Sequence, residues 1–113
     1  MNENSTVQEM RKGLLVLAVL HTLKNKKLYA ADILSALQNT EFTTQEGTLY
    51  PLLSRLKREG LIDHEWVESS SGPPRKYYVL NTLGRARAKE LMTYMNTMRN
   101  DLKKLGEDKK DNE

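Results

Sequence analysis

The sequence reads EGTLYPLLSRLKREGLI from residue 46 to residue 62 and SSSGPPRKYYVL from residue 69 to residue 80. One stripe of leucines in the first segment follows the i, i+3, i+4, i+7 spacing of a helix with one buried face: Leu49, Leu52, Leu53 and Leu56. Gly60 is expected to end this helix. Pro51 is expected to bend its first turn, because the proline ring presses on the carbonyl group of Gly47.

A capping pattern marks the start of this helix. Thr43 and Glu46 have the S/T-x-x-E spacing of a capping box, which predicts a helix from Thr44 to Glu59 with Thr43 as its N-cap. The ridge opposite the leucines carries hydroxyl and guanidinium groups: Thr44, Thr48, Ser54, Arg55 and Arg58. Such a helix fits the major groove of DNA, although a solvated polar face is the commoner state of an isolated amphipathic helix.

The second segment predicts a β-hairpin with a cationic end. Residues 62–66 alternate as in a half-buried strand, in which Trp66 is expected to pack in the core. Residues 69–74 are expected to form a loop, and residues 76–80 the returning strand. A basic hairpin that follows such a helix is the layout of a winged helix-turn-helix protein. The predicted fold is therefore mainly α with a small β-hairpin.

Helices are also expected at residues 6–23, at residues 29–37 and from residue 82 past Leu102. The first is apolar around its whole circumference from Leu14 to Leu20, so it must be covered on more than one side, by its own chain or by a second subunit. The last carries a heptad seam, spaced 4, 3, 4, 3, 4 and 3: Gly84, Ala88, Leu91, Met95, Met98, Leu102 and Leu105.

These elements predict three parts of the chain. Residues 1–81 form a winged helix-turn-helix DNA-binding domain, residues 82–106 a C-terminal dimerisation helix and residues 107–113 a disordered tail. The seam is expected to meet its symmetry mate or the first helix of the partner. The residues assigned to dimerisation are Leu14, Leu17, Leu91, Met95, Met98 and Leu102.

Composition excludes several functions. The net charge is only +3, but from residue 67 to residue 100 six Lys or Arg residues oppose two acids, as expected for a local contact with phosphates. The absence of cysteine excludes disulfides and thiolate metal sites, and no apolar run is long enough to span a membrane, so a cytoplasmic protein is expected. His21 and His64 lack further metal ligands at a recognisable spacing, and no catalytic motif is present, so neither a cofactor nor an enzymatic activity is expected.

The expected DNA-binding residues divide by chemistry. Glutamine pairs with adenine and threonine methyl groups pack on thymine, so the start of the helix is expected to contact bases, while phenol and guanidinium groups hold phosphates. The residues assigned to DNA binding are Thr44, Gln45, Thr48, Tyr50, Ser54 and Arg55 in the helix and Arg75, Lys76 and Tyr77 in the hairpin.

Three pieces of the sequence together resemble the PadR family of bacterial transcriptional regulators. These pieces are GTLYPLL at residues 47–53, EGLI at residues 59–62 and GPPRKYY at residues 72–78, followed by LNTLG at residues 80–84. The resemblance covers roughly residues 10 to 105. It implies a dimeric winged-helix protein, usually a repressor, and the single C-terminal helix is similar to the compact branch of the family.

The resemblance also implies a place for an effector. In compact relatives, planar apolar compounds enter the space between the two C-terminal helices, and Met92, Met95 and Met98 would line that space here. The alternative is that these methionines only fill the dimer seam. The expected function is a dimeric regulator that represses from an inverted-repeat operator in double-stranded DNA. A winged-helix protein-interaction module and a small-molecule sensor with a secondary DNA role remain as alternatives.

Overall fold

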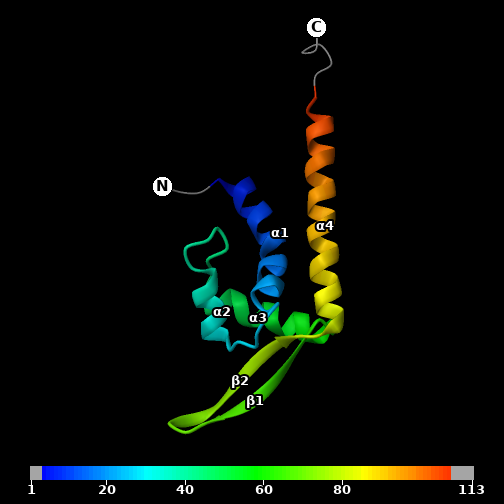
Figure 1. Cartoon of the computed structure of the whole chain (residues 1–113). Coiled ribbons are helices and arrows are strands. Elements are labelled where there is room, and N and C mark those ends of the chain that lie inside the picture. Colours follow the sequence, from blue (N-terminus) through cyan, green and yellow to red (C-terminus); the bar gives the residue numbers. More distant parts are fainter. Residues whose placement is uncertain (1–3, 108–113) are drawn as a thin grey trace.

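The computed structural model describes residues 4–107 and contains four helices and one two-stranded sheet. The elements in chain order are α1 (Ser5–Thr22), α2 (Ala30–Leu37), α3 (Glu46–Arg58), β1 (Ile62–Ser69), β2 (Gly72–Leu80) and α4 (Thr82–Leu105). Figure 1 shows α4 beside α1, and the hairpin projects from the end of the molecule opposite the C-terminal end of α4. The predicted fold class is thereby confirmed. The tail expected at residues 107–113 lies outside the described residues beyond Glu107.

The core lies where α1, α2 and α3 meet the inner end of the hairpin. Leu20, Ile33, Leu53 and Ile62 are at most 1% exposed. The predicted leucine stripe of α3 is confirmed, since Leu49, Leu53 and Leu56 are buried and Leu52 packs against them. Burial of each such side chain contributes about 2 kcal/mol before entropy is counted. The stripe therefore fixes which side of α3 faces solvent.

The start of α3 differs from the prediction. The helix begins at Glu46 after an extended Gln45, and within residues 4–107 no side chain at that N-cap makes a capping hydrogen bond. The capping box at Thr43 is wrong because the preceding loop is anchored elsewhere. Thr40 Oγ1 donates to the Leu37 carbonyl at 2.7 Å and accepts from the backbone amide of residue 42 at 3.0 Å. The chain therefore reaches α3 three residues after Thr43.

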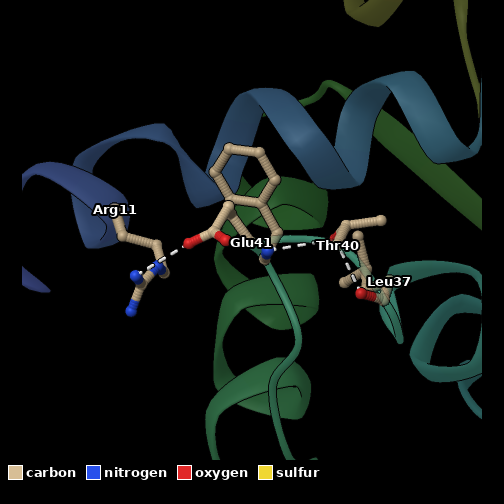
Figure 2. A network of polar contacts seen from close by, with 5 residues as sticks. Arg11, Leu37, Thr40 and Glu41 are labelled. Atoms are coloured by element: carbon tan, nitrogen blue, oxygen red, sulfur yellow. Dashed lines mark hydrogen bonds and ion pairs between the residues drawn. The ribbon is translucent and has the colours of Figure 1, made fainter. Parts of the chain in front are cut away.

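The same loop is tied to α1. Arg11 Nη2 donates to Glu41 Oε1 at 3.0 Å, and Figure 2 shows this pair beside the Thr40 and Leu37 contacts. Asn39 has a φ of 66°, a left-handed conformation that asparagine tolerates better than most residues. These contacts set the position at which the chain enters α3.

The hairpin is longer and its turn is tighter than predicted. β1 and β2 pair antiparallel, with a bulge between Val67 and Ser69, and only residues 70 and 71 form the turn. The expected loop at residues 69–74 is therefore wrong, because β2 already begins at Gly72. Pro73 and Pro74 are accepted within β2 because a two-stranded sheet consists of edge strands, where a missing N–H costs little.

Near its C-terminal end, β2 also forms a single β-bridge along its other edge, between Tyr78 and Leu28. Leu28 N donates to Tyr78 O at 3.0 Å, and Tyr78 N donates to Leu28 O at 2.7 Å. This bridge joins the hairpin to the segment before α2 and holds its base against the helices.

α4 starts at Thr82 as predicted, and Asn81 is its N-cap. Gly84 N donates to Asn81 Oδ1 at 2.8 Å, and Asn81 Nδ2 donates to the Gly60 carbonyl at 2.9 Å. Gly60 has a φ of 80° and Leu61 N donates to Leu56 O, so the predicted glycine stop of α3 is confirmed.

The seam of α4 divides in two. Gly84 and Ala88 are buried in their own chain, and Leu91 packs against the same core, so this part needs no second subunit. Toward the C-terminus Leu102 is 67% exposed and Leu105 is 82% exposed. Of the α1 residues assigned to dimerisation, Leu17 lies buried in its own core and Leu14 is half-buried near α4.

Candidate nucleic-acid interface

The outer side of α3 carries the residues expected to meet DNA. Gln45, Thr48, Tyr50, Ser54 and Arg55 are exposed, while Thr44 is half-buried just before the helix. The buried leucine stripe forces this arrangement, because residues on the opposite ridge must then face solvent. α3 thus presents one polar surface over its whole length.

This surface has two flanks with different neighbours. Thr48 lines a pocket of about 290 Å³ with Gln8, Arg11 and Lys12 of α1. Arg55 lies nearer α1 and α4, and its Nε is 3.2 Å from Glu59 Oε2 in an exposed ion pair of little energetic weight. The sequence predicted that Thr48 and Arg55 bind DNA together with the hairpin residues, but both lie on the flank of α3 that faces α1.

The other flank of α3 faces the hairpin. Burial raises the pKa of Tyr78 in β2, and Tyr50 of α3 adds to that rise. Lys57 of α3 is close enough to His64 of β1 to lower the pKa of the histidine. Lys57 was missed by the sequence reasoning, although its spacing of seven residues from Tyr50 places the two side chains on the same flank.

The three hairpin residues expected to act together are separated by the strand. Arg75 and Tyr77 lie on one face of β2 and Lys76 lies on the other, because successive side chains alternate. The three residues also stand within the strand and not at a loop. The guanidinium carbon of Arg75 is 4.6 Å from the ring centroid of Tyr29, and the Tyr29 and Tyr77 rings meet edge to face at 5.3 Å.

The face of the hairpin that carries Arg75 and Tyr77 also carries an ion pair between Lys27 and Glu65. Lys27 Nζ donates to Glu65 Oε1 at 2.6 Å, and this hydrogen bond raises the pKa of Lys27. Lys27 Nζ also lies 5.8 Å from the ring centroid of Tyr77. The charge of Glu65 is therefore matched by a lysine on this face.

On the face of the hairpin that carries Lys76, Trp66 is 63% exposed, so the prediction that it packs in the core is wrong. The strand alternation was correct, but the preceding inward residue, His64, is already only half-buried, and Trp66 lies farther out along the projecting hairpin. Lys76 Nζ lies 5.3 Å from the Trp66 ring centroid, and the His64 and Trp66 rings meet at 6.4 Å and 81°.

His64 lies between the rings of Trp66 and Tyr78, with centroid distances of 6.4 Å and 6.3 Å, and its pKa is shifted. Burial lowers its pKa below the ordinary 6.5, and the nearby Lys76 and Lys57 lower it further, against a smaller opposite effect of Asp63. Its Nδ1 atom has no hydrogen-bond partner within residues 4–107. The neutral form of the imidazole is therefore favoured.

We expect Lys76→Met to raise the pKa of His64, as measured by an NMR titration of the imidazole nitrogens. Lys103→Met removes an equal charge at the far end of α4 and should leave this pKa unchanged. Because the unfolded chain binds the proton at higher pH than the folded one, the free energy of unfolding should fall as the pH drops below 6.5. An unchanged His64 pKa in Lys76→Met would contradict the assigned proximity.

Within residues 4–107, no helix is both long and apolar enough to cross a membrane. The same residues contain no group of three or more His, Cys, Asp or Glu side chains that would hold a metal ion.

Known proteins are similar to this chain in both fold and sequence. The model of the PadR-like transcriptional regulator family matches residues 19–90, which include α2, α3 and the hairpin. The chain belongs to this family. Members of the PadR-like family are DNA-binding transcriptional regulators and not enzymes. The alternative of a protein-interaction module without DNA binding is set aside on this ground.

Solved PadR-like structures agree over nearly the whole chain. A PadR-like transcription factor from Bacteroides fragilis is 38% identical with a TM-score of 0.78, over 91% of this chain and 100% of the other. A PadR family regulator from Eggerthella lenta is 33% identical with a TM-score of 0.82, over 89% and 88%. An uncharacterised protein from Lysinibacillus sphaericus is 32% identical over 84 residues, which is 72% of this chain and 77% of that protein.

Proposed function

We propose that this PadR-like protein is a homodimeric repressor that binds an inverted-repeat operator in the bacterial cytoplasm. In each subunit α3 enters the major groove and the hairpin holds the adjacent backbone. The observation that carries the proposal is the continuity of the surface from α3 to the hairpin. Tyr50 and Lys57 of α3 lie beside Tyr78 and His64 of the hairpin, so helix and hairpin approach a duplex together.

Base and phosphate contacts come from different parts of this surface. Gln45 and Thr48 stand exposed at the start of α3, the part of a recognition helix that approaches base edges. Lys76 and Arg75 carry the positive charge of the hairpin and suit the phosphates that flank the groove. The first pair therefore sets sequence preference, and the second sets affinity for any duplex.

The dimer follows from the uncovered end of α4. Met98, Leu102 and Leu105 share the heptad seam and are 41%, 67% and 82% exposed. An apolar seam of this kind is stable in water when a second helix covers it. The two-fold axis then separates the two half-sites by one helical turn of about 10 base pairs or a multiple of it.

An apolar effector is supported by a pocket between α1 and α4. The pocket has a volume of about 430 Å³ and is lined almost only by apolar atoms, with Met92 and Met95 on its α4 side. Met95 and Met98 line a neighbouring pocket at the same helix pair. A planar apolar compound in this place would change how α4 sits on α1 and, through the dimer, the distance between the two recognition helices.

The experiment that tests the proposal is selection of bound duplexes from a random-sequence pool at about 150 mM salt, near physiological ionic strength. An enriched inverted repeat is expected. A pool without an enriched motif would contradict a sequence-specific regulator that acts alone.

Variants then separate the two kinds of contact. Lys76→Ala should weaken binding to all duplexes alike and reduce the slope of log affinity against log salt by about one unit. Thr48→Ala should instead change the enriched sequence and cost about 1–3 kcal/mol on the selected operator. Lys103→Ala, which removes a charge from the last turn of α4, is the matched control and should bind as the parent does. Unchanged binding of Lys76→Ala to every duplex would refute the role of the hairpin.

A further inference from the structure

Trp66 is a large exposed aromatic side chain on the face of the hairpin that also packs against the body. Nearer the body, this face of the hairpin contributes Ile62, Tyr78 and Leu80 to the core. Trp66 pairs with Lys76 across the strands, one step beyond the pair of half-buried His64 and buried Tyr78. Its ring is thus left in solvent at the point where the hairpin leaves the body, while His64 and Lys76 on the same face are half-buried.

The surroundings of Trp66 combine aromatic rings with positive charge. Tyr50 of α3 is 47% exposed and lies beside Tyr78, so exposed rings stand at both ends of the surface that joins α3 to the hairpin. Lys57 and Lys76 approach this surface from α3 and β2. Glu65 belongs to the opposite face of β1 by strand alternation and is bonded there to Lys27. The surface is therefore aromatic and cationic at once.

The orientation of the Trp66 ring is set before any partner binds. The Lys76 ammonium group lies over the ring at 5.3 Å, and the edge-to-face contact with His64 holds it from the side of the body. A side chain that is already ordered loses little entropy on binding. The fixed orientation of the Trp66 ring therefore favours a role in binding a partner over accidental exposure.

We propose that Trp66 packs against the deoxyribose–phosphate backbone of bound DNA, with Lys76 pairing to the adjacent phosphate. The inference rests on the proposed function, since the duplex strand that passes from the groove at α3 to the hairpin must cross this surface. DNA matches both properties of the surface, because its sugars offer an apolar face and its phosphates offer negative charge. An acidic protein lacks this regular alternation of apolar and anionic groups, so DNA is the partner to which the chemistry points.

Trp66 is the only tryptophan in the chain, so its fluorescence reports on this site alone. In the free protein, acrylamide should quench its emission efficiently. With a saturating amount of the selected unlabelled duplex, the quenching constant should fall at least about threefold, as expected for a ring covered by nucleic acid. Binding itself is followed separately with a labelled copy of the same duplex.

Variants test whether the contact contributes affinity. Trp66→Ala should weaken binding to all duplexes by about tenfold, and Trp66→Phe should recover most of this loss, because a ring is retained. The salt slope of Trp66→Ala should equal that of the parent, since no charge is removed. Leu83→Ala, which deletes an exposed apolar side chain in the first turn of α4, is the control and should bind normally.

The outcomes separate this inference from the proposed function. If the duplex binds but Trp66 stays equally open to acrylamide, or if Trp66→Ala binds as the parent does, the contact is refuted and the repressor stands. If no duplex binds to the folded protein, the proposed function fails and the inference fails with it. Thermal melts of the variants identify any loss that comes from unfolding.

Discussion

Gly84→Ala is expected to lower the free energy of unfolding by about 3 kcal/mol, the upper end of the usual cost of overpacking. A Cβ atom at this position would lie 2.0 Å from the carbonyl oxygen of Leu61 and 2.6 Å from Cδ1 of Leu80. The leucine tip has room to rotate, but the Leu61 oxygen is backbone and accepts a hydrogen bond from Asn81 N. The start of α4 must therefore move away, which also strains its Asn81 cap.

The measurement is denaturant unfolding followed by circular dichroism. Gly47→Ala is the matched control, because Gly47 also lies in the first turn of a helix but a Cβ atom there meets nothing within 4 Å. This variant should lose no stability, since alanine is a better helix former than glycine. Equal denaturation midpoints for Gly84→Ala and the parent would show that α4 does not start against the Leu61 carbonyl.

Much of the fold was present in the local pattern of the sequence. The leucine spacing of α3, the glycine stop at Gly60 and the start of α4 at Thr82 each rest on one element or one turn, and all three are confirmed. The errors arose where contacts between residues far apart in the sequence determine the structure. Thr43 has the correct spacing for a cap, but the Thr40 contacts in the preceding loop place it outside the helix.

The hairpin shows the same division between local and distant information. Alternation correctly predicted a half-buried strand, but nothing in residues 62–66 states where the body of the protein ends. Trp66 was therefore placed in the core although it lies beyond it. The prolines were assigned to a loop, but proline is tolerated on an edge strand such as β2.

The candidate site was found as a list of residues but not as a surface. Helical spacing identified the outer ridge of α3, yet it gives no neighbours for the two flanks of that ridge. Only the packed structure separates Thr48 and Arg55, which lie toward α1, from Tyr50 and Lys57, which lie toward the hairpin. The arrangement of charges around a site depends on these neighbours, which is why Lys57 was overlooked.

Leu102→Glu is expected to dissociate the proposed dimer, with a rise of about 100-fold or more in the dissociation constant. In the dimer this position would lie in the heptad seam, where an unpaired charge loses its hydration without compensation, and the symmetry mate would bring a second carboxylate to it. In one subunit Leu102 is 67% exposed, so the substitution leaves the core of the chain intact. The variant should therefore stay folded as a monomer of 13.0 kDa.

Sedimentation velocity measures this change, and Asn100→Glu is the control. The Asn100→Glu substitution introduces the same charge two residues away, on the side of α4 that faces away from the seam. It should leave the dimer unchanged. The monomer should also lose most of its affinity for the inverted repeat, because each recognition helix must then bind its half-site alone. A Leu102→Glu protein that remains dimeric would show that the exposed end of α4 is not the interface, and the two-fold arrangement proposed for the operator would then need another source.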